Sequence, residues 1–292
     1  MTGRTAPPAP ATPVLRHAEH VMGTVFSFVV RDPGPGTEET LQRIAARLHR
    51  IDAVLSPYRP GSDISRLDRG ELALDACHPD VPAALARCRA LTEETGGYFS
   101  ARPAGRLDPS GWVKGWAVEE ASRMLTAAGS RQHCVSGGGD VQTAGGPWRI
   151  GIADPLRPGR VAAVLAGHDL AVATSGTAER GAHVVDPHTG RPAEGLASLT
   201  LVGSAGTGIA RTDAWTTAAF AMGPERGLAW AGRHPEVEAL TLLPDGARRW
   251  TAGFARHLPP AGPADWRLPP AAPAAATAPA PAPAPGHVPG HA

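Results

Sequence analysis

Lys114 is the residue whose type is hardest to explain by composition. The chain has 28 basic residues, and Lys114 is its only lysine. An ammonium is a compact, strongly hydrated point charge, whereas a guanidinium is a planar fork, so the two differ beside a phosphate in a tight site. Small and turn-forming residues precede Lys114 and an amphipathic run (113–125) follows it, which predicts a loop feeding a helix N-terminus, where anions are favoured. The alternative is a lysine retained by chance on a helix surface.

Asp213 and Thr217 form a second candidate pair. They are four residues apart, so on a helix they lie on one face. We expect Thr212 to cap that helix and Asp213 to lie in its first turn. A carboxylate and a hydroxyl are two hard oxygen ligands, which suits Mg²⁺ together with water and phosphate. The alternative is a capping aspartate and a threonine whose hydroxyl bonds back to the helix.

Several polar loops carry weaker signals. The glycine cluster at 136–140 lacks the G-x-G-x-x-G spacing of a dinucleotide-binding loop. Ser175 has no G-x-S-x-G context, so a hydrolase nucleophile is not indicated. His183 opens a short apolar run (183–185), where a lone histidine is more often a structural residue than a catalytic one.

The elements that must position these residues alternate between strands and helices. Apolar stripes at helical spacing predict helices, and β-rich runs predict strands. Helices are expected from Thr37 to about 55, and at 79–95, 113–125, 209–222 and 224–233, with a short turn or helix beginning at 62–65. Strands are expected at 24–30, 133–136, 148–152, 161–165, 170–173, 183–185, 198–202, 238–243 and 248–251. The mixture predicts α+β sheets covered by helices, without an internal repeat.

Composition excludes several classes of function. A formal net charge of +1 and a charged fraction of 19% create no overall field that would attract nucleic acid or a membrane surface. The aromatic fraction of 5% argues against a stacking platform for single-stranded nucleic acid. The three cysteines form no C-x-x-C pair and are expected to be small buried side chains in a reducing compartment.

The ends of the chain differ from its middle. Residues 1–13 and 259–292 are rich in Pro and Ala and are expected to be disordered, because they cannot bury enough apolar area. Residues 14–258 are expected to form the functional domain. The N-terminal segment shows no signal-peptide or lipid-anchor pattern, and no window reaches the length of a membrane span. The expectation is a cytoplasmic protein without a membrane anchor.

Taken together, many motifs in fixed order resemble those of the ApbE family of FAD:protein FMN transferases. They lie at residues 22–24, 51–58, 63–65, 96–99, 108–118, 138–140, 173–176, 183–187 and 189–192, and end with Asp213 and Thr217. The resemblance covers roughly residues 20–255.

The resemblance implies an ApbE-like, T-fold-like α+β fold of mixed sheets flanked by helices. It implies a Mg²⁺-dependent enzyme that cleaves FAD, releases AMP, and joins FMN to a Thr or Ser hydroxyl of a target flavoprotein. The metal ligands would be the side chains of Asp213 and Thr217 and the backbone carbonyl of Gly111. The FAD-contacting positions would be Met22, Tyr58, Tyr98, Phe99, Ser100, Asp108, Lys114, His183 and Val184.

The acceptor hydroxyl needs a base, and His183 is the first candidate and Asp108 the second; Lys114 would contact the nucleotide or the developing charge. The chain departs from the family at residues 100–103, where many relatives carry Asp-Pro-Thr, and at 177–178, where an aromatic residue is usual. Family members are typically exported, which nothing in this sequence indicates. Two other functions stay open: a Mg²⁺-dependent FAD pyrophosphatase giving FMN and AMP, and a non-catalytic FAD-binding protein.

Overall fold

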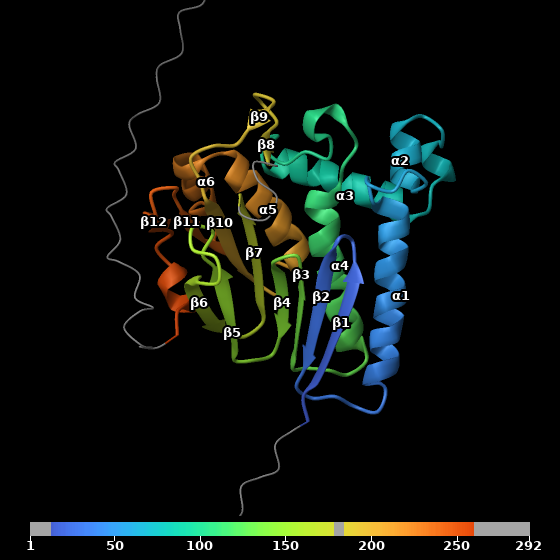
Figure 1. Ribbon diagram of the computed structural model, residues 1–292, viewed down its shortest axis with the longest axis horizontal. Coiled ribbons are helices and arrows are strands. Elements are labelled where there is room, and N and C mark those ends of the chain that lie inside the picture. Colours follow the sequence, from blue (N-terminus) through green and yellow to red (C-terminus); the bar gives the residue numbers. More distant parts are fainter. Residues whose placement is uncertain (1–12, 178–183, 260–292) are drawn as a thin grey trace, which may run out of the picture.

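An eight-stranded sheet is the centre of the computed structural model, which describes residues 13–177 and 184–259 (Figure 1). Every neighbouring pair in it is antiparallel, in the order β1-β2-β3-β4-β7-β10-β11-β12. The strands are β1 (Leu15–Val21), β2 (Thr24–Val30), β3 (His133–Gly137), β4 (Asp140–Ala144), β7 (Leu170–Gly176), β10 (Ser198–Ser204), β11 (Val237–Leu242) and β12 (Arg248–Trp250). Two further antiparallel pairs are β5 (Trp148–Ala153) with β6 (Val161–Gly167), and β8 (Val185–Asp186) with β9 (Arg191–Pro192).

The α-helices lie where the apolar stripes predict them. They are α1 (Thr37–Leu55), α2 (Asp63–Asp68), α3 (Asp80–Glu94), α4 (Ser110–Ala127), α5 (Ile209–Ala221) and α6 (Pro224–Ala231), with short 3₁₀ turns at η1 (Leu74–Ala76), η2 (Pro103–Gly105) and η3 (Phe254–His257). Helix α1 begins at Thr37, with Gly36 at the N-cap position, and Thr37 Oγ1 accepts the N–H of Gly34, 2.8 Å away.

Helices cover one face of the sheet, and α4 packs on β3 and β4 while α5 packs on β7 and β10 (Figure 1). The strands supply this core in alternation: Ala171 and Ala173 of β7 belong to the helix-side core, whereas Leu170 and Val172 belong to a smaller core on the other face. The β5–β6 pair covers that other face. Successive side chains of a strand point to opposite faces of the sheet, so β7 contributes to the cores on both faces.

Three strands were not predicted from the sequence: β1, β4 and the two-residue β9. Strand β1 alternates in exposure but not in polarity, because four of the five residues at 16–20 are charged or titratable. Strand β4 begins at Asp140, inside the stretch interpreted as a polar loop. The turn itself is only Gly138-Gly139, whose φ values of 56° and 90° suit a two-residue hairpin. Because the turn is so short, no further turn residues separate it from the start of β4, and the strand was not recognised.

Within residues 13–177 and 184–259, no helix combines the length and apolarity that spanning a membrane requires. The two terminal segments predicted to be disordered lie outside the described residues except for residues 13 and 259. His183 also lies outside them. Of the cysteines, Cys77 and Cys88 are buried and Cys134 is half-buried, and all three are free thiols. Burial raises the pKa of the Cys88 thiol to about 12.

Buried His133 gives the fold a pH dependence. Its Nε2 lies 2.9 Å from Ser122 Oγ and its Nδ1 3.1 Å from Ser130 Oγ. Burial lowers the pKa of this imidazole to about 4, against the opposing attraction of Asp32. The unfolded chain takes up this proton near pH 6.5 and the folded chain only near pH 4, so stability falls as pH drops through that window. We expect a loss of about 3 kcal/mol at most from this group.

Chemical denaturation between pH 7.5 and pH 4.5 measures this loss. The His133→Gln variant should show a shallower decline than the wild-type protein over the same window. Equal slopes for the two proteins would show that His133 does not control the acid response.

Candidate functional site

Three elements bring the chemically distinctive residues together on the helix side of the sheet. Lys114 lies on α4, Asp213 on α5, and Asp140 directly after the β3–β4 turn. The Lys114 ammonium forms an ion pair with Asp140 Oδ2 and lies 3.9 Å from Asp213 Oδ1. It also donates to the Gly138 carbonyl at 3.4 Å. Asp140 is fully buried and Asp213 is 4% exposed, so two carboxylates share one ammonium out of water.

The electrostatic surroundings of Asp213 oppose its ionisation. Burial, and next the nearby Asp140, hold the pKa of the Asp213 carboxyl well above its usual range, although Lys114 and the Gly115 N–H act in the opposite direction. Both causes act against the ionised form of Asp213. A cation bound beside this carboxylate would favour the ionised form.

Glycine at position 115 allows α4 and α5 to approach closely. A Cβ there would lie 2.8 Å from Asp213 Cβ and 2.9 Å from the Ile209 carbonyl oxygen. The Gly115 N–H donates to Asp213 Oδ2 at 3.1 Å. In an α-helix the carbonyl of residue i points at the N–H of residue i+4, so the Gly111 carbonyl and the Asp213 carboxylate converge on the same N–H. Gly111 also lies beside Thr217, whose Oγ1 would be 3.9 Å from a Cβ built on it.

The contrast between Gly115 and Gly111 gives a matched pair of variants. In Gly115→Ala the new methyl group overlaps α5, which we expect to cost about 1–3 kcal/mol of unfolding free energy and to displace Asp213. In Gly111→Ala the methyl group meets Phe99 at 3.4 Å, an ordinary contact, so stability should change by less than about 0.5 kcal/mol. Urea denaturation of both variants tests this. Equal destabilisation would show that the α4–α5 contact is not limited by Gly115.

The start of α4 differs from the expectation. The helix begins at Ser110, so Lys114 lies in its second turn and not at the N-terminus. The carboxylate of Asp108 accepts the N–H of Ser110 at 2.9 Å, an Asx-type turn that supplies the negative group this terminus attracts. The terminus was predicted three residues too late because Ser110 and Gly111 were counted with the loop. In the structure Asp108 therefore supports α4.

The start of α5 also differs. Gly208, with φ +79°, precedes the first helical residue, Ile209. Thr212 is not the cap, because its hydroxyl donates to the Gly208 carbonyl at 2.8 Å, and Asp213 lies one turn inside the helix. The sequence signal was misleading because threonine is common both at caps and in bonds back to the preceding turn. Asp213 and Thr217 still lie four apart on one helix, and Thr217 is half-buried.

A second group of predicted positions lies between α3 and α4. Phe99 is buried and lies next to Gly111. Tyr98 is half-buried, with its ring 4.4 Å from that of His188 and the Arg226 guanidinium 5.1 Å above it. The Ser100 hydroxyl accepts the N–H of Arg102 at 3.0 Å.

Val184 is the first described residue after 177. It is buried in the helix-side core, and its carbonyl accepts the N–H of Ala193 at 2.8 Å. Its predicted neighbour His183 lies outside the described residues.

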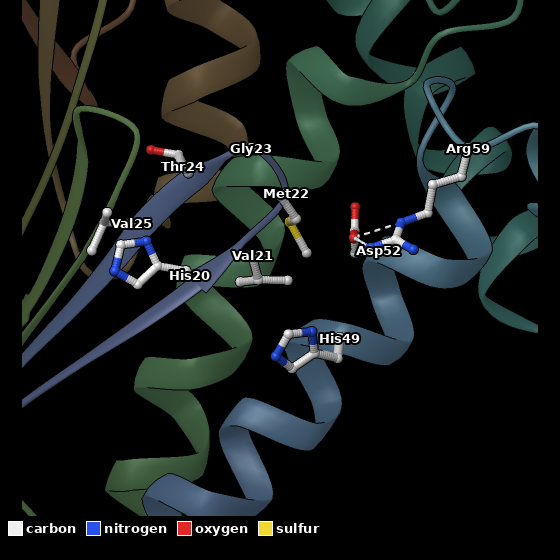
Figure 2. A pocket seen from close by; sticks show the side chains of 9 residues that line it. All are labelled: His20, Val21, Met22, Gly23, Thr24, Val25, His49, Asp52 and Arg59. Atoms are coloured by element: carbon white, nitrogen blue, oxygen red, sulfur yellow. Dashed lines mark hydrogen bonds and ion pairs between the residues drawn. The ribbon is translucent and has the colours of Figure 1, made fainter.

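A third group lies at the β1–β2 turn. Met22 has a φ of 55° there, and it lines a pocket of about 380 Å³ between the hairpin and α1 (Figure 2). Asp52 and Arg59 border the same pocket and form a hydrogen-bonded ion pair with an Nε–Oδ2 distance of 2.8 Å. Tyr58, just before Arg59, is 75% exposed. The structure thus places Met22 at the pocket beside α1 and Tyr58 just before its Arg59.

Asp140 is the functional candidate that sequence reasoning missed. It appeared in the Gly138-Gly139-Asp140 motif but received no role, because a carboxylate after two glycines is also an ordinary turn residue. Its complete burial beside Lys114 distinguishes it. Among the described residues no group of three or more His, Cys, Asp or Glu side chains is arranged to hold a metal. A cation site here would use hydroxyl, carbonyl and substrate oxygens beside Asp213.

Comparisons with known proteins agree on one family. The ApbE family model matches residues 22–102 and 100–241. The chain is 38% identical to the FAD:protein FMN transferase of Rhodobacter capsulatus over 138 residues, which cover 43% of this chain and 26% of that protein. It is 26% identical to the FAD:protein FMN transferase of Vibrio cholerae over 276 residues, which cover 72% of this chain and 82% of that protein.

Solved structures share the fold. The flavinyl transferase ApbE of Pseudomonas stutzeri superposes with a TM-score of 0.72 at 25% identity, covering 84% of this chain and 97% of that one. The ApbE protein of Thermotoga maritima superposes with a TM-score of 0.76 at 21% identity, covering 85% of this chain and all of that one.

Proposed function

The chain belongs to the ApbE family, and we propose that it transfers FMN from FAD to a threonine or serine hydroxyl of a target flavoprotein, with release of AMP. Relatives named FAD:protein FMN transferase support the reaction. The observation that carries the proposal for this chain is the cluster in which the half-buried Lys114 meets the buried carboxylates of Asp140 and Asp213. A pyrophosphate brings negative charge that such a site can hold only with added cations.

We propose Mg²⁺ as the cation. The Asp213 carboxylate is buried beside Asp140 and Lys114, and the nearby Thr217 hydroxyl and Gly111 carbonyl are hard oxygen donors of the kind that Mg²⁺ prefers. These three groups would hold it, with water and phosphate oxygens completing the shell. When bound, Mg²⁺ neutralises pyrophosphate charge and helps to align the groups that exchange.

The side chains of the chain have separate tasks in this proposal. Lys114 pairs with Asp140, and its ammonium would also attract the phosphate being transferred. Gly115 orients Asp213 through its N–H. Asp108 supports the first turn of α4, which makes it a weaker candidate for the base than His183. The FAD contacts would come from Met22, Tyr58, Tyr98, Phe99, Ser100 and the segment at 183–184.

The experiment follows two products together. Purified protein is incubated with FAD, Mg²⁺ and a small acceptor domain that carries a threonine open to flavinylation. Fluorescence of the acceptor on a denaturing gel and AMP release are then compared. Equal amounts of labelled acceptor and AMP are the expected result. AMP without label would instead identify a pyrophosphatase, and neither product in the presence of bound FAD would identify a flavin-binding protein.

The acceptor we propose is a cytoplasmic flavoprotein, which follows from the location expected from the sequence. Cell fractionation followed by immunoblotting tests this location. Recovery of the protein from the periplasmic or membrane fraction would contradict it.

A further inference from the structure

The N-terminus of α5 is held by two side chains from other elements. The N–H of Ile209 donates to Gln142 Oε1 and the N–H of Ala210 donates to Glu119 Oε2, each at 3.0 Å. Gln142 lies on β4 and is 4% exposed, and Glu119 lies on α4. The first N–H groups of a helix have no partner within it, so these two bonds determine where α5 begins.

The same two elements carry the other members of the charged cluster. Asp140 and Gln142 are two residues apart on β4, so both point to the helix-covered face. Glu119 lies four residues after Gly115, and therefore on the same side of α4. Strand β4 thus contacts Lys114 through Asp140 and α5 through Gln142. Helix α4 contacts α5 through Gly115 and Glu119.

Close packing makes this arrangement sensitive to small shifts. A Cβ on Gly208 would overlap the Glu119 carboxylate, and a Cβ on Gly115 would lie 3.1 Å from Ala210 Cα. The anchored residues 209 and 210 precede Asp213 by four and three positions, about one helical turn. A rotation or slide of the first turn of α5 would therefore move the Asp213 carboxylate directly.

We propose that Gln142 and Glu119 are positioning residues that fix the rotation and height of α5, so that Asp213 and Thr217 face the cation. This inference rests on the proposed function, because it assigns a role toward the Mg²⁺ site of that reaction. Neither side chain contacts substrate in this account. Both act through the backbone of α5.

Matched variants distinguish the positioning of α5 by Glu119 and Gln142 from the general effect of losing a side-chain hydrogen bond. Glu119→Met and Gln142→Met remove the acceptor while keeping length, whereas Glu119→Gln keeps an acceptor oxygen. Gln132→Met is the control, because Gln132 Oε1 accepts the N–H of Gly146 at 3.2 Å in a different part of the fold. If Gln142→Met does not fold, Gln142→Asn withdraws the amide by one methylene in its place.

Two readouts are used, neither of which depends on turnover. Binding of Mn²⁺ alone is followed by the loss of the free-ion EPR signal, and amide hydrogen exchange is measured at residues 209–210. We expect both acceptor-removing variants to bind Mn²⁺ about tenfold more weakly, a typical effect of outer-shell partners, and to exchange these amides at least tenfold faster. Glu119→Gln and Gln132→Met should bind Mn²⁺ within twofold of the wild-type protein.

The outcomes distinguish this inference from the proposed function. Wild-type Mn²⁺ affinity in Glu119→Met and Gln142→Met, with fast exchange at residues 209–210, would overturn the positioning role and leave the metal site intact. An equal loss of affinity in Gln132→Met would also overturn it, since the effect would then be general destabilisation. A wild-type protein that binds no Mn²⁺ would overturn the metal assignment itself.

Discussion

Asp213→Asn is expected to lower the rate of FMN transfer about a thousandfold, because it removes the charged ligand of the proposed cation site. The amide keeps an oxygen that can accept the Gly115 N–H, which is 3.1 Å from the carboxylate in the wild-type protein. The substitution therefore changes the charge of the site and leaves the α4–α5 contact in place. Fluorescent labelling of the acceptor domain under saturating FAD and Mg²⁺ measures the rate.

Stability provides the control for this variant. The raised pKa of Asp213 means that the folded state disfavours its charged form, so at pH 8 in EDTA the neutral amide should leave unfolding free energy unchanged or raise it. Added Mg²⁺ should stabilise the wild-type protein but not the variant. Undiminished transfer by a folded Asp213→Asn protein would contradict the assignment of Asp213 as a metal ligand.

Lys114→Met is expected to cost about 3 kcal/mol of unfolding free energy, because it leaves Asp140 and Asp213 buried without their shared ammonium. Transfer should fall at least a hundredfold. Lys114→Arg keeps the charge and most of the stability, but Gly138 limits the space: a Cβ there would lie 3.0 Å from Lys114 Cδ. A guanidinium is larger and planar, so we expect transfer by Lys114→Arg to fall about tenfold or more.

A second substitution tests the electrostatic origin of this cost. Adding Asp140→Asn to Lys114→Met removes one of the two stranded carboxylates and should recover much of the lost stability, which a double-mutant cycle by urea denaturation quantifies. Additive losses would show that the pair is not coupled. Full transfer activity in Lys114→Arg would show that the size and shape of the guanidinium do not impair the reaction at this position.

Much of the fold was readable because its elements bury one face. The stripe from Leu41 to Leu55 predicted α1, and every member of it is buried. The β10 and β11 strands were predicted within one or two residues because their β-rich runs are bounded by turn residues. Strand β1 was missed because it lies at the sheet edge and carries titratable side chains. Its sequence therefore contains no run of apolar residues that would indicate a strand.

The candidate site was less readable than the fold. The pairing of Asp213 with Thr217 followed from helical spacing, and the motif order supplied Gly111 and Lys114. Contacts between elements could not be derived, because they depend on how closely α4 and α5 approach at Gly115. For that reason Asp140, 26 residues after Lys114 in the chain, received no role in the sequence analysis although it is the partner of the lysine.

The intact mass of the acceptor domain tests the central claim most directly. The domain and its Thr→Val variant are incubated with this protein, FAD and Mg²⁺, then with EDTA in place of Mg²⁺. The account predicts a mass increase of one FMN less one water on the threonine form, absent from the valine form and absent in EDTA. An unchanged acceptor mass while AMP accumulates would contradict transfer, and the same mass increase in EDTA would contradict the cation site.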